Sequence, residues 1–197
     1  MFWKNKRVQD WSLLSTLTDV EFVGFFHNQW IDGLWDMAGN TRLAGLFISD
    51  FTRLHSLDGI RRAPRLERLY FGDAVWPTSI LDDIQALKEC RLKAFHFAGK
   101  AIKDDDVTPY TTMNHLEILD FPPNLYATDQ LAWLVARLPH VEGYALGPFV
   151  QYESPKGDKD VRICGKGKPL LSSTKDASKV AKYVDSFQRM VERSRAT

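Results

Sequence analysis

The chain has 197 residues, which suits one domain with a substantial core. Its 26 lysines and arginines against 25 aspartates and glutamates give a net charge of +1, which argues against nucleic acid or an anionic membrane as the main partner. Two cysteines exclude a disulfide scaffold, and no apolar run reaches the length of a signal peptide or of a membrane span. We therefore expect a cytoplasmic protein that does not contact membranes.

Residues 1–19 are expected to form an N-terminal cap. Val8, Trp11, Leu14 and Leu17 recur at helical spacing, so the sequence predicts a short helix here. Such a cap would protect the first edge of a following sheet, because an open edge invites aggregation.

One short pattern recurs from residue 20 onward: apolar, two variable, apolar, one variable, apolar. Successive copies begin 23 to 26 residues apart, which chance does not readily produce six times. The six copies are VEFVGF from Val20, LAGLFI from Leu43, LERLYF from Leu66, LKAFHF from Leu92, LEILDF from Leu116 and VEGYAL from Val141.

Each copy predicts a short strand whose fourth and sixth residues point into the core. Strands are expected near residues 22, 45, 68, 94, 118 and 143, stacked in parallel so that neighbours share one core. The connections predict helices where apolar spacing follows a capping residue. One is expected from Thr128 through Leu138, and another after Ser79 through Leu87.

Residues 51–71 resemble the short leucine-rich repeats of bacterial internalins and of a phosphatase regulatory subunit, and residues 104–121 resemble them more loosely. The resemblance covers residues 17–148 and implies an α/β fold. The fold that the resemblance implies is a right-handed solenoid of about six repeats, with a parallel sheet on the concave face and helices or turns on the convex face. The family's loop asparagine is matched only by Asn28 and Asn124. Such resemblance implies a binding scaffold without naming its partner.

Residues 20–148 are thus assigned to the repeats and residues 149–197 to a C-terminal cap. Within the cap, Val161 and Ile163 predict a strand after a polar loop. A terminal amphipathic helix is expected from about Lys175 to Arg193, with Thr174 as its N-cap.

Chemistry-bearing motifs are weak. The GKGKP run from Gly165 to Pro169 suits an anion but lacks the spacing of a phosphate-binding loop, so a turn is the better interpretation. The acidic run Asp104–Asp106 lacks the calcium-loop pattern, and the five histidines form no zinc motif. We expect no enzyme activity, no metal and no cofactor.

The variable strand positions face away from the core and gather aromatic residues over the first repeats. A partner-binding site is predicted at Phe22, Phe26, Phe47, Arg68, Tyr70 and His96. There are two alternatives to partner binding: residues 1–7 or the N-terminal cap cover these residues, or the residues form a homodimer. Beside this site, Arg65 and Arg91 are expected to pair with Glu67 across the strands.

The leading functional hypothesis is a protein–protein interaction module that binds its partner through this aromatic half of the concave face. A narrower hypothesis is an inhibitor or immunity-type protein that occludes a toxin surface. The alternative is a phosphate-ligand or nucleic-acid binder that uses the basic Gly165–Pro169 loop. The sequence identifies neither the partner nor the oligomeric state.

Overall fold

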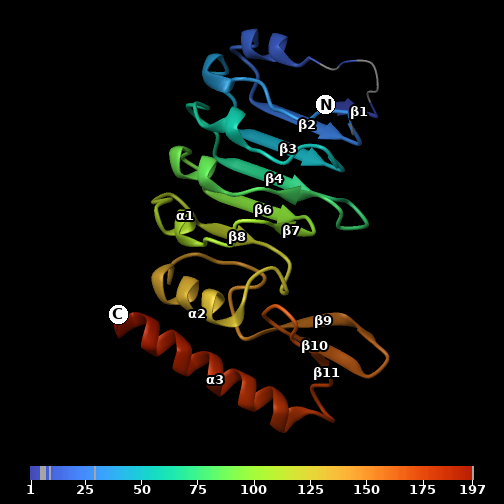
Figure 1. Cartoon of the computed structure of the whole chain (residues 1–197), viewed down its shortest axis with the longest axis vertical. Coiled ribbons are helices and arrows are strands. Elements are labelled where there is room, and N and C mark those ends of the chain that lie inside the picture. Colours follow the sequence, from blue (N-terminus) through green and yellow to red (C-terminus); the bar gives the residue numbers. More distant parts are fainter. Residues whose placement is uncertain (5–7, 9, 29, 197) are drawn as a thin grey trace. The chain divides into compact units, whose positions relative to one another are not determined.

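The computed structural model describes residues 1–4, 8, 10–28 and 30–196, apart from the side chains of residues 154–156 (Figure 1). It is a mixed α/β structure with a six-stranded parallel sheet and a C-terminal helix. The chain divides into two compact units, Met1–Ile118 and Leu119–Thr197, and each is described by itself.

The parallel sheet has the strand order β1-β2-β3-β4-β6-β8. Five predicted strands are confirmed, and Figure 1 shows β2, β3, β4 and β6 side by side in chain order. Residues at equivalent repeat positions pair in register from β2 to β6. The strands are β1 Phe2–Trp3, β2 Phe22–Phe26, β3 Gly45–Ser49, β4 Arg68–Gly72, β6 Ala94–Ala98 and β8 Ile118–Asp120.

The core of the sheet follows the predicted alternation. The fourth and sixth motif residues of the first five copies are at most 3% exposed. Burying one such side chain contributes about 1.5–3 kcal/mol, so each repeat that adds two of them stabilises the sheet further. These residues are Val23, Phe25, Leu46, Ile48, Leu69, Phe71, Phe95, Phe97, Leu119 and Phe121.

The connections in the first unit are mostly single 3-10 turns. The helix predicted from Ser79 through Leu87 is wrong at its start, where the Ser79 hydroxyl donates to Asp73 (2.8 Å) and to the Phe51 carbonyl (3.3 Å), and only its end is helical, as the 3-10 turn η4, Gln85–Glu89. The chain instead forms β5, Ile80–Leu81, which pairs in parallel with β7, Ala101–Ile102. The remaining elements are η1 Ser12–Thr16, η2 Met37–Gly39, η3 Asp58–Ile60, η4 Gln85–Glu89 and α1 Thr108–Thr111.

The N-terminal segment differs from the predicted helix. Among the described residues of this segment, only Ser12–Thr16 is helical, as a 3-10 turn, and Val8 and Leu17 are exposed. β1 pairs with β2, and Asn28 fixes the edge by donating to the carbonyls of Phe2 (3.3 Å) and Phe26 (3.2 Å). Asn28 thus ties the backbone of β1 to that of β2.

The strand predicted near residue 143 is wrong. Only Glu142 continues the ladder, as its carbonyl accepts from Leu119 N (2.8 Å). The chain then turns, with Leu146 N donating to the Gly143 carbonyl (3.2 Å). As a result Tyr144, predicted to be core, is 53% exposed.

The second unit combines two helices with an antiparallel sheet of order β11-β10-β9. The strand predicted at Val161 and Ile163 is confirmed, and both residues are buried. The terminal helix begins two residues later than expected, and the Thr174 hydroxyl contacts Ser172 (3.1 Å). The elements are α2 Thr128–Arg137, β9 Phe149–Lys156, β10 Lys159–Ile163, β11 Leu170–Leu171 and α3 Ala177–Ala196.

Candidate functional site on the aromatic face of the parallel sheet

The six residues predicted to bind a partner occupy the outward third, fifth and seventh motif positions in the first unit. The register of the sheet places these positions in three rows that run across the strands. The rows hold Phe22 and Arg68, then Phe47, Tyr70 and His96, and then Phe26. We call these six residues the aromatic face.

Phe47 and Tyr70 form the centre of the aromatic face. They are register partners on β3 and β4, and their rings stack with centroids 4.5 Å apart and planes inclined by 15°. The two rings therefore stand side by side on adjacent strands. Both side chains are half-buried, so the pair is ordered yet accessible.

The Tyr70 hydroxyl is a neutral hydrogen-bond donor. It donates to the Asp73 carbonyl over 3.4 Å. Burial, followed by the negative charges of Asp50 and Asp73, raises the pKa of Tyr70 above its usual value. His96, its register partner on β6, is half-buried and completes the central row.

Phe22 is the most exposed ring of the aromatic face, at 56%. It lies against two glycines: a Cβ on Gly45 would be 2.8 Å from its Cδ2, and a Cβ on Gly24 would be 3.1 Å from its Cε1. Larger residues at these positions would displace the ring. The glycines therefore let Phe22 lie close to the sheet.

The N-terminus extends the aromatic face at its β2 edge. Trp3 pairs in register with Phe26, and their rings stack with centroids 4.3 Å apart. β1 lies beside β2 in the sheet, and because Trp3 remains 62% exposed it adds aromatic surface. Residues 5–7, part of the segment considered as a possible cover, lie outside the described residues.

Charges border the aromatic face in a different pairing from the one predicted. Glu67 pairs with Lys93 (3.0 Å), and neither Arg65 nor Arg91 has an ion pair among the described residues. Lys93 is the partner of Glu67 because the two residues share one motif row on adjacent strands. Arg42 is paired as well, with Glu21 and Asp19.

A loop beyond β4, held at its end by hydrogen bonds to Asp73, carries aromatic surface that the sequence analysis missed. The buried Asp73 carboxylate accepts from Thr78 N (2.7 Å), Ser79 N (2.8 Å) and the Ser79 hydroxyl (2.8 Å). This fixes a loop that presents Val75 and Trp76, which are 74% and 79% exposed.

Trp30 is a second loop aromatic, 50% exposed, with the Arg53 guanidinium 4.7 Å from its ring. Trp30 and Trp76 were missed because only strand positions were considered. A tryptophan close to a proline in a short connection, as in the Trp76–Pro77 pair, is the signal that could have found one of them.

The alternative site at Gly165–Pro169, in the second unit, uses its amides internally. Gly165 N donates to the Pro123 carbonyl (2.7 Å) and Lys166 N to the Tyr126 carbonyl (2.8 Å). The Lys168 ammonium lies 5.5 Å from the Tyr183 ring centre. A cradle for phosphate needs free amides pointing at the anion, so this loop is less suited than its composition indicated.

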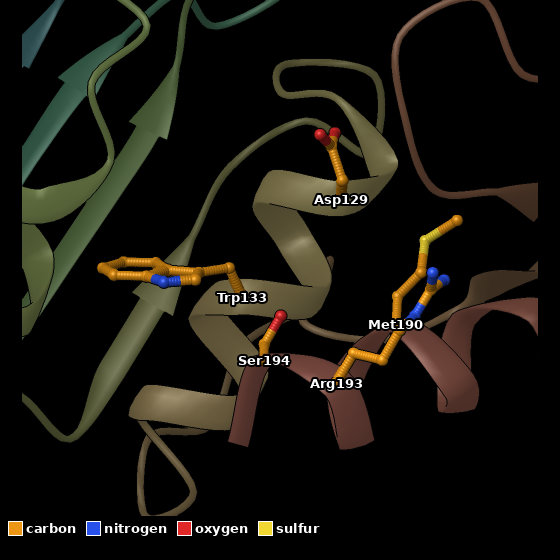
Figure 2. Close-up of a pocket in the computed structure, with 5 residues that line it drawn as sticks. All are labelled: Asp129, Trp133, Met190, Arg193 and Ser194. Atoms are coloured by element: carbon orange, nitrogen blue, oxygen red, sulfur yellow. The ribbon is translucent and has the colours of Figure 1, made fainter. Parts of the chain in front are cut away.

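An open groove of about 380 Å³ lies between α2 and α3. Figure 2 shows Trp133 on α2 and Met190 on α3 among its lining side chains, with Asp129, Arg193 and Ser194. The lining combines apolar and charged groups but contains neither a thiol nor an imidazole.

The thiols are not suited to nucleophilic chemistry. Cys90 and Cys164 are both buried and unpaired. Burial raises the pKa of Cys90 to about 12 and that of Cys164 to about 11, so both stay protonated near neutral pH. Among the described residues, no group of three or more histidine, cysteine or acidic side chains is arranged to hold a metal ion.

Comparisons with protein-family models and with curated proteins find no match. Within the described part of the chain, no helix has both the length and the apolar content required to cross a membrane.

Proposed function

We propose that the chain is a short leucine-rich-repeat solenoid that acts as a protein–protein interaction module and binds its partner through the aromatic face. The observation that carries this proposal is the stacked Phe47–Tyr70 pair at the centre of that face, with exposed Phe22 beside it. Aromatic residues on an ordered sheet lose little side-chain entropy on binding, and they are enriched at binding hot spots.

The repeat assignment rests on the in-register strands and on motif spacing. In a solenoid each unit contacts mainly its neighbours, so outward positions are free to vary and to form a continuous surface. Trp3 and the Trp76 loop add aromatic area near the ends of strands. Exposed aromatic surface of this extent is typical of an interface.

Site-specific photo-cross-linking tests the proposal. A benzophenone amino acid at position 22 should cross-link one protein in an extract of the producing organism, whereas the same group at the exposed Tyr144 position should not. The partner, once identified by mass spectrometry, should bind the purified chain directly.

Phe47→Ala combined with Tyr70→Ala should lower the affinity of that partner at least about 30-fold, since losing a central aromatic often costs about 2 kcal/mol. A matched control, Leu13→Ala with Tyr144→Ala, also removes two exposed apolar side chains and should leave binding unchanged. If no protein cross-links at position 22, or if the double variant folds and binds normally, the proposed function is wrong.

A further inference from the structure

The amino-terminal ends of β4 and β6 carry three arginines without a carboxylate partner among the described residues. Arg68 stands on the aromatic face, and Arg65 and Arg91 hold one repeat position, three residues before their strands. All three are exposed. They differ from Arg42 at the equivalent position of β3, which is paired with Glu21 and Asp19.

The local charge is positive because the acids nearby are few. Within the first unit, Glu67 of that motif row pairs with Lys93 over 3.0 Å and Glu21 pairs with Arg42, so Glu117, next to β6, is the remaining acid of the row. Arg65, Arg68 and Arg91 therefore outnumber the carboxylates available to them. An exposed guanidinium without a partner is free to take one from another molecule.

Arg68 is accessible to such a partner because its own side chain is exposed. Its register neighbour on β6, Ala94, carries only a methyl group, and on the β3 side the Phe22 ring lies over Gly45. The stacked Phe47–Tyr70 pair occupies the next outward row. A carboxylate could therefore reach Arg68 while an apolar or aromatic side chain beside it covers the ring pair.

We infer that the aromatic face binds an acidic polypeptide segment, in which carboxylates contact Arg65, Arg68 and Arg91 and an apolar or aromatic side chain packs on Phe47 and Tyr70. The inference rests on the proposed function and specifies its partner. A polypeptide fits better than nucleic acid because carboxylate charge and apolar side chains are both required, and the half-buried rings lie beside the arginines in separate rows.

Fluorescence anisotropy with defined probes tests the inference. A labelled random copolymer of glutamate and tyrosine should bind more tightly than polyglutamate of the same length or a single-stranded oligothymidylate. Arg65→Glu, Arg68→Glu and Arg91→Glu together should weaken copolymer binding at least about tenfold. The three Arg→Lys changes should retain most of it, because the charge remains.

The matched control is Lys182→Glu, Arg189→Glu and Arg195→Glu on exposed positions of α3, which alters net charge equally and should leave copolymer affinity unchanged. Thermal melts check that both triple variants fold. Equal loss in the control would show non-specific attraction. Tighter binding of the oligothymidylate would show a phosphate site, and dimerisation abolished by the arginine changes would show a second copy as occupant. Each of these results overturns the inference.

The experiments distinguish failure of the proposed function from failure of the acidic-partner inference. A protein that cross-links at position 22 and is unaffected by the arginine changes preserves the proposed function and refutes the acidic partner. Absence of any cross-link at position 22 refutes the proposed function whatever the copolymer shows.

Discussion

The segments LERLYF, from Leu66, and VEGYAL, from Val141, have the same apolar spacing, yet they fold differently. The first becomes β4, with Leu69 and Phe71 fully buried. The second contributes one ladder contact and then turns, which leaves Tyr144 exposed. The difference shows that apolar spacing specifies a strand only when the positions between and after the apolar residues allow one.

Two local features separate the segments. After β4, Asp73 holds the exit loop through hydrogen bonds to Thr78 and Ser79. In VEGYAL, Gly143 lies so close to the Leu119 carbonyl that a Cβ there would be 2.1 Å from the oxygen. Pro148, which follows within a few residues, has no amide to donate to a ladder.

The largest effect is expected on the β4 side of the comparison. Asp73→Ala should lower the free energy of unfolding by about 2–3 kcal/mol, because it leaves the buried Ser79 amide and the part-buried Thr78 amide without an acceptor. Urea denaturation measures the change. Asp19→Ala, at a side chain 88% exposed, is the control and should change stability by less than about 0.5 kcal/mol. If Asp73→Ala is as stable as Asp19→Ala, the hydrogen bonds of Asp73 do not stabilise the loop after β4.

A smaller loss of stability is expected in the VEGYAL segment. Gly143→Ala should destabilise the protein by about 1–2 kcal/mol, because the added Cβ collides with the Leu119 carbonyl. Gly147→Ala is the matched control, since the nearest atom to its Cβ is 4.0 Å away. Urea midpoints compare the two. A Gly143→Ala protein as stable as wild type would mean that close approach does not explain the missing strand.

The sequence predicted the five strands because their apolar pairs, such as Leu46/Ile48, need only alternate to find a common core. It failed where a single tertiary contact decides. Ser79 has the sequence of a helix cap, but the Asp73 carboxylate captures its amide and hydroxyl. β1 could not be foreseen, because two residues carry no periodicity and only pairing with β2 orders them.

The candidate site was predictable for the same reason as the strands. Once Phe47 and Tyr70 hold one repeat position, a parallel register makes them neighbours. Trp76 was not predictable in this way, because its exposure depends on the hydrogen bonds of Asp73 rather than on repeat position. The partner of Glu67 was also mispredicted, because Lys93 holds the same motif row on the adjacent strand and pairs with it in place of the arginines.

The smallest predicted effect concerns the tyrosines of the two compared segments. The pKa of Tyr70 and that of Tyr144 are both raised, in each case first by burial, so folding favours the neutral phenol. This stability is fully present below the unfolded tyrosine pKa of about 10 and is lost as pH rises through the higher folded value.

Tyr70→Phe should therefore flatten the alkaline loss of stability, measured as urea midpoints between about pH 9 and 11. Tyr144→Phe should flatten it less, because that ring is 53% exposed and no carboxylate contributes to its shift. The reverse order would contradict the assignment of Tyr70 to the more enclosed environment.

The distribution of tryptophan between the two units has an optical consequence. Five of the six indoles belong to Met1–Ile118, and Trp133 alone belongs to the second unit. The longest helix, α3, belongs to the second unit and lacks tryptophan. Emission will therefore follow mainly the first unit as the protein unfolds, and far-ultraviolet dichroism will be weighted toward the second. Two melting curves recorded on one sample will thus show whether the units unfold together: coincident midpoints mean one cooperative transition, and separated midpoints mean two.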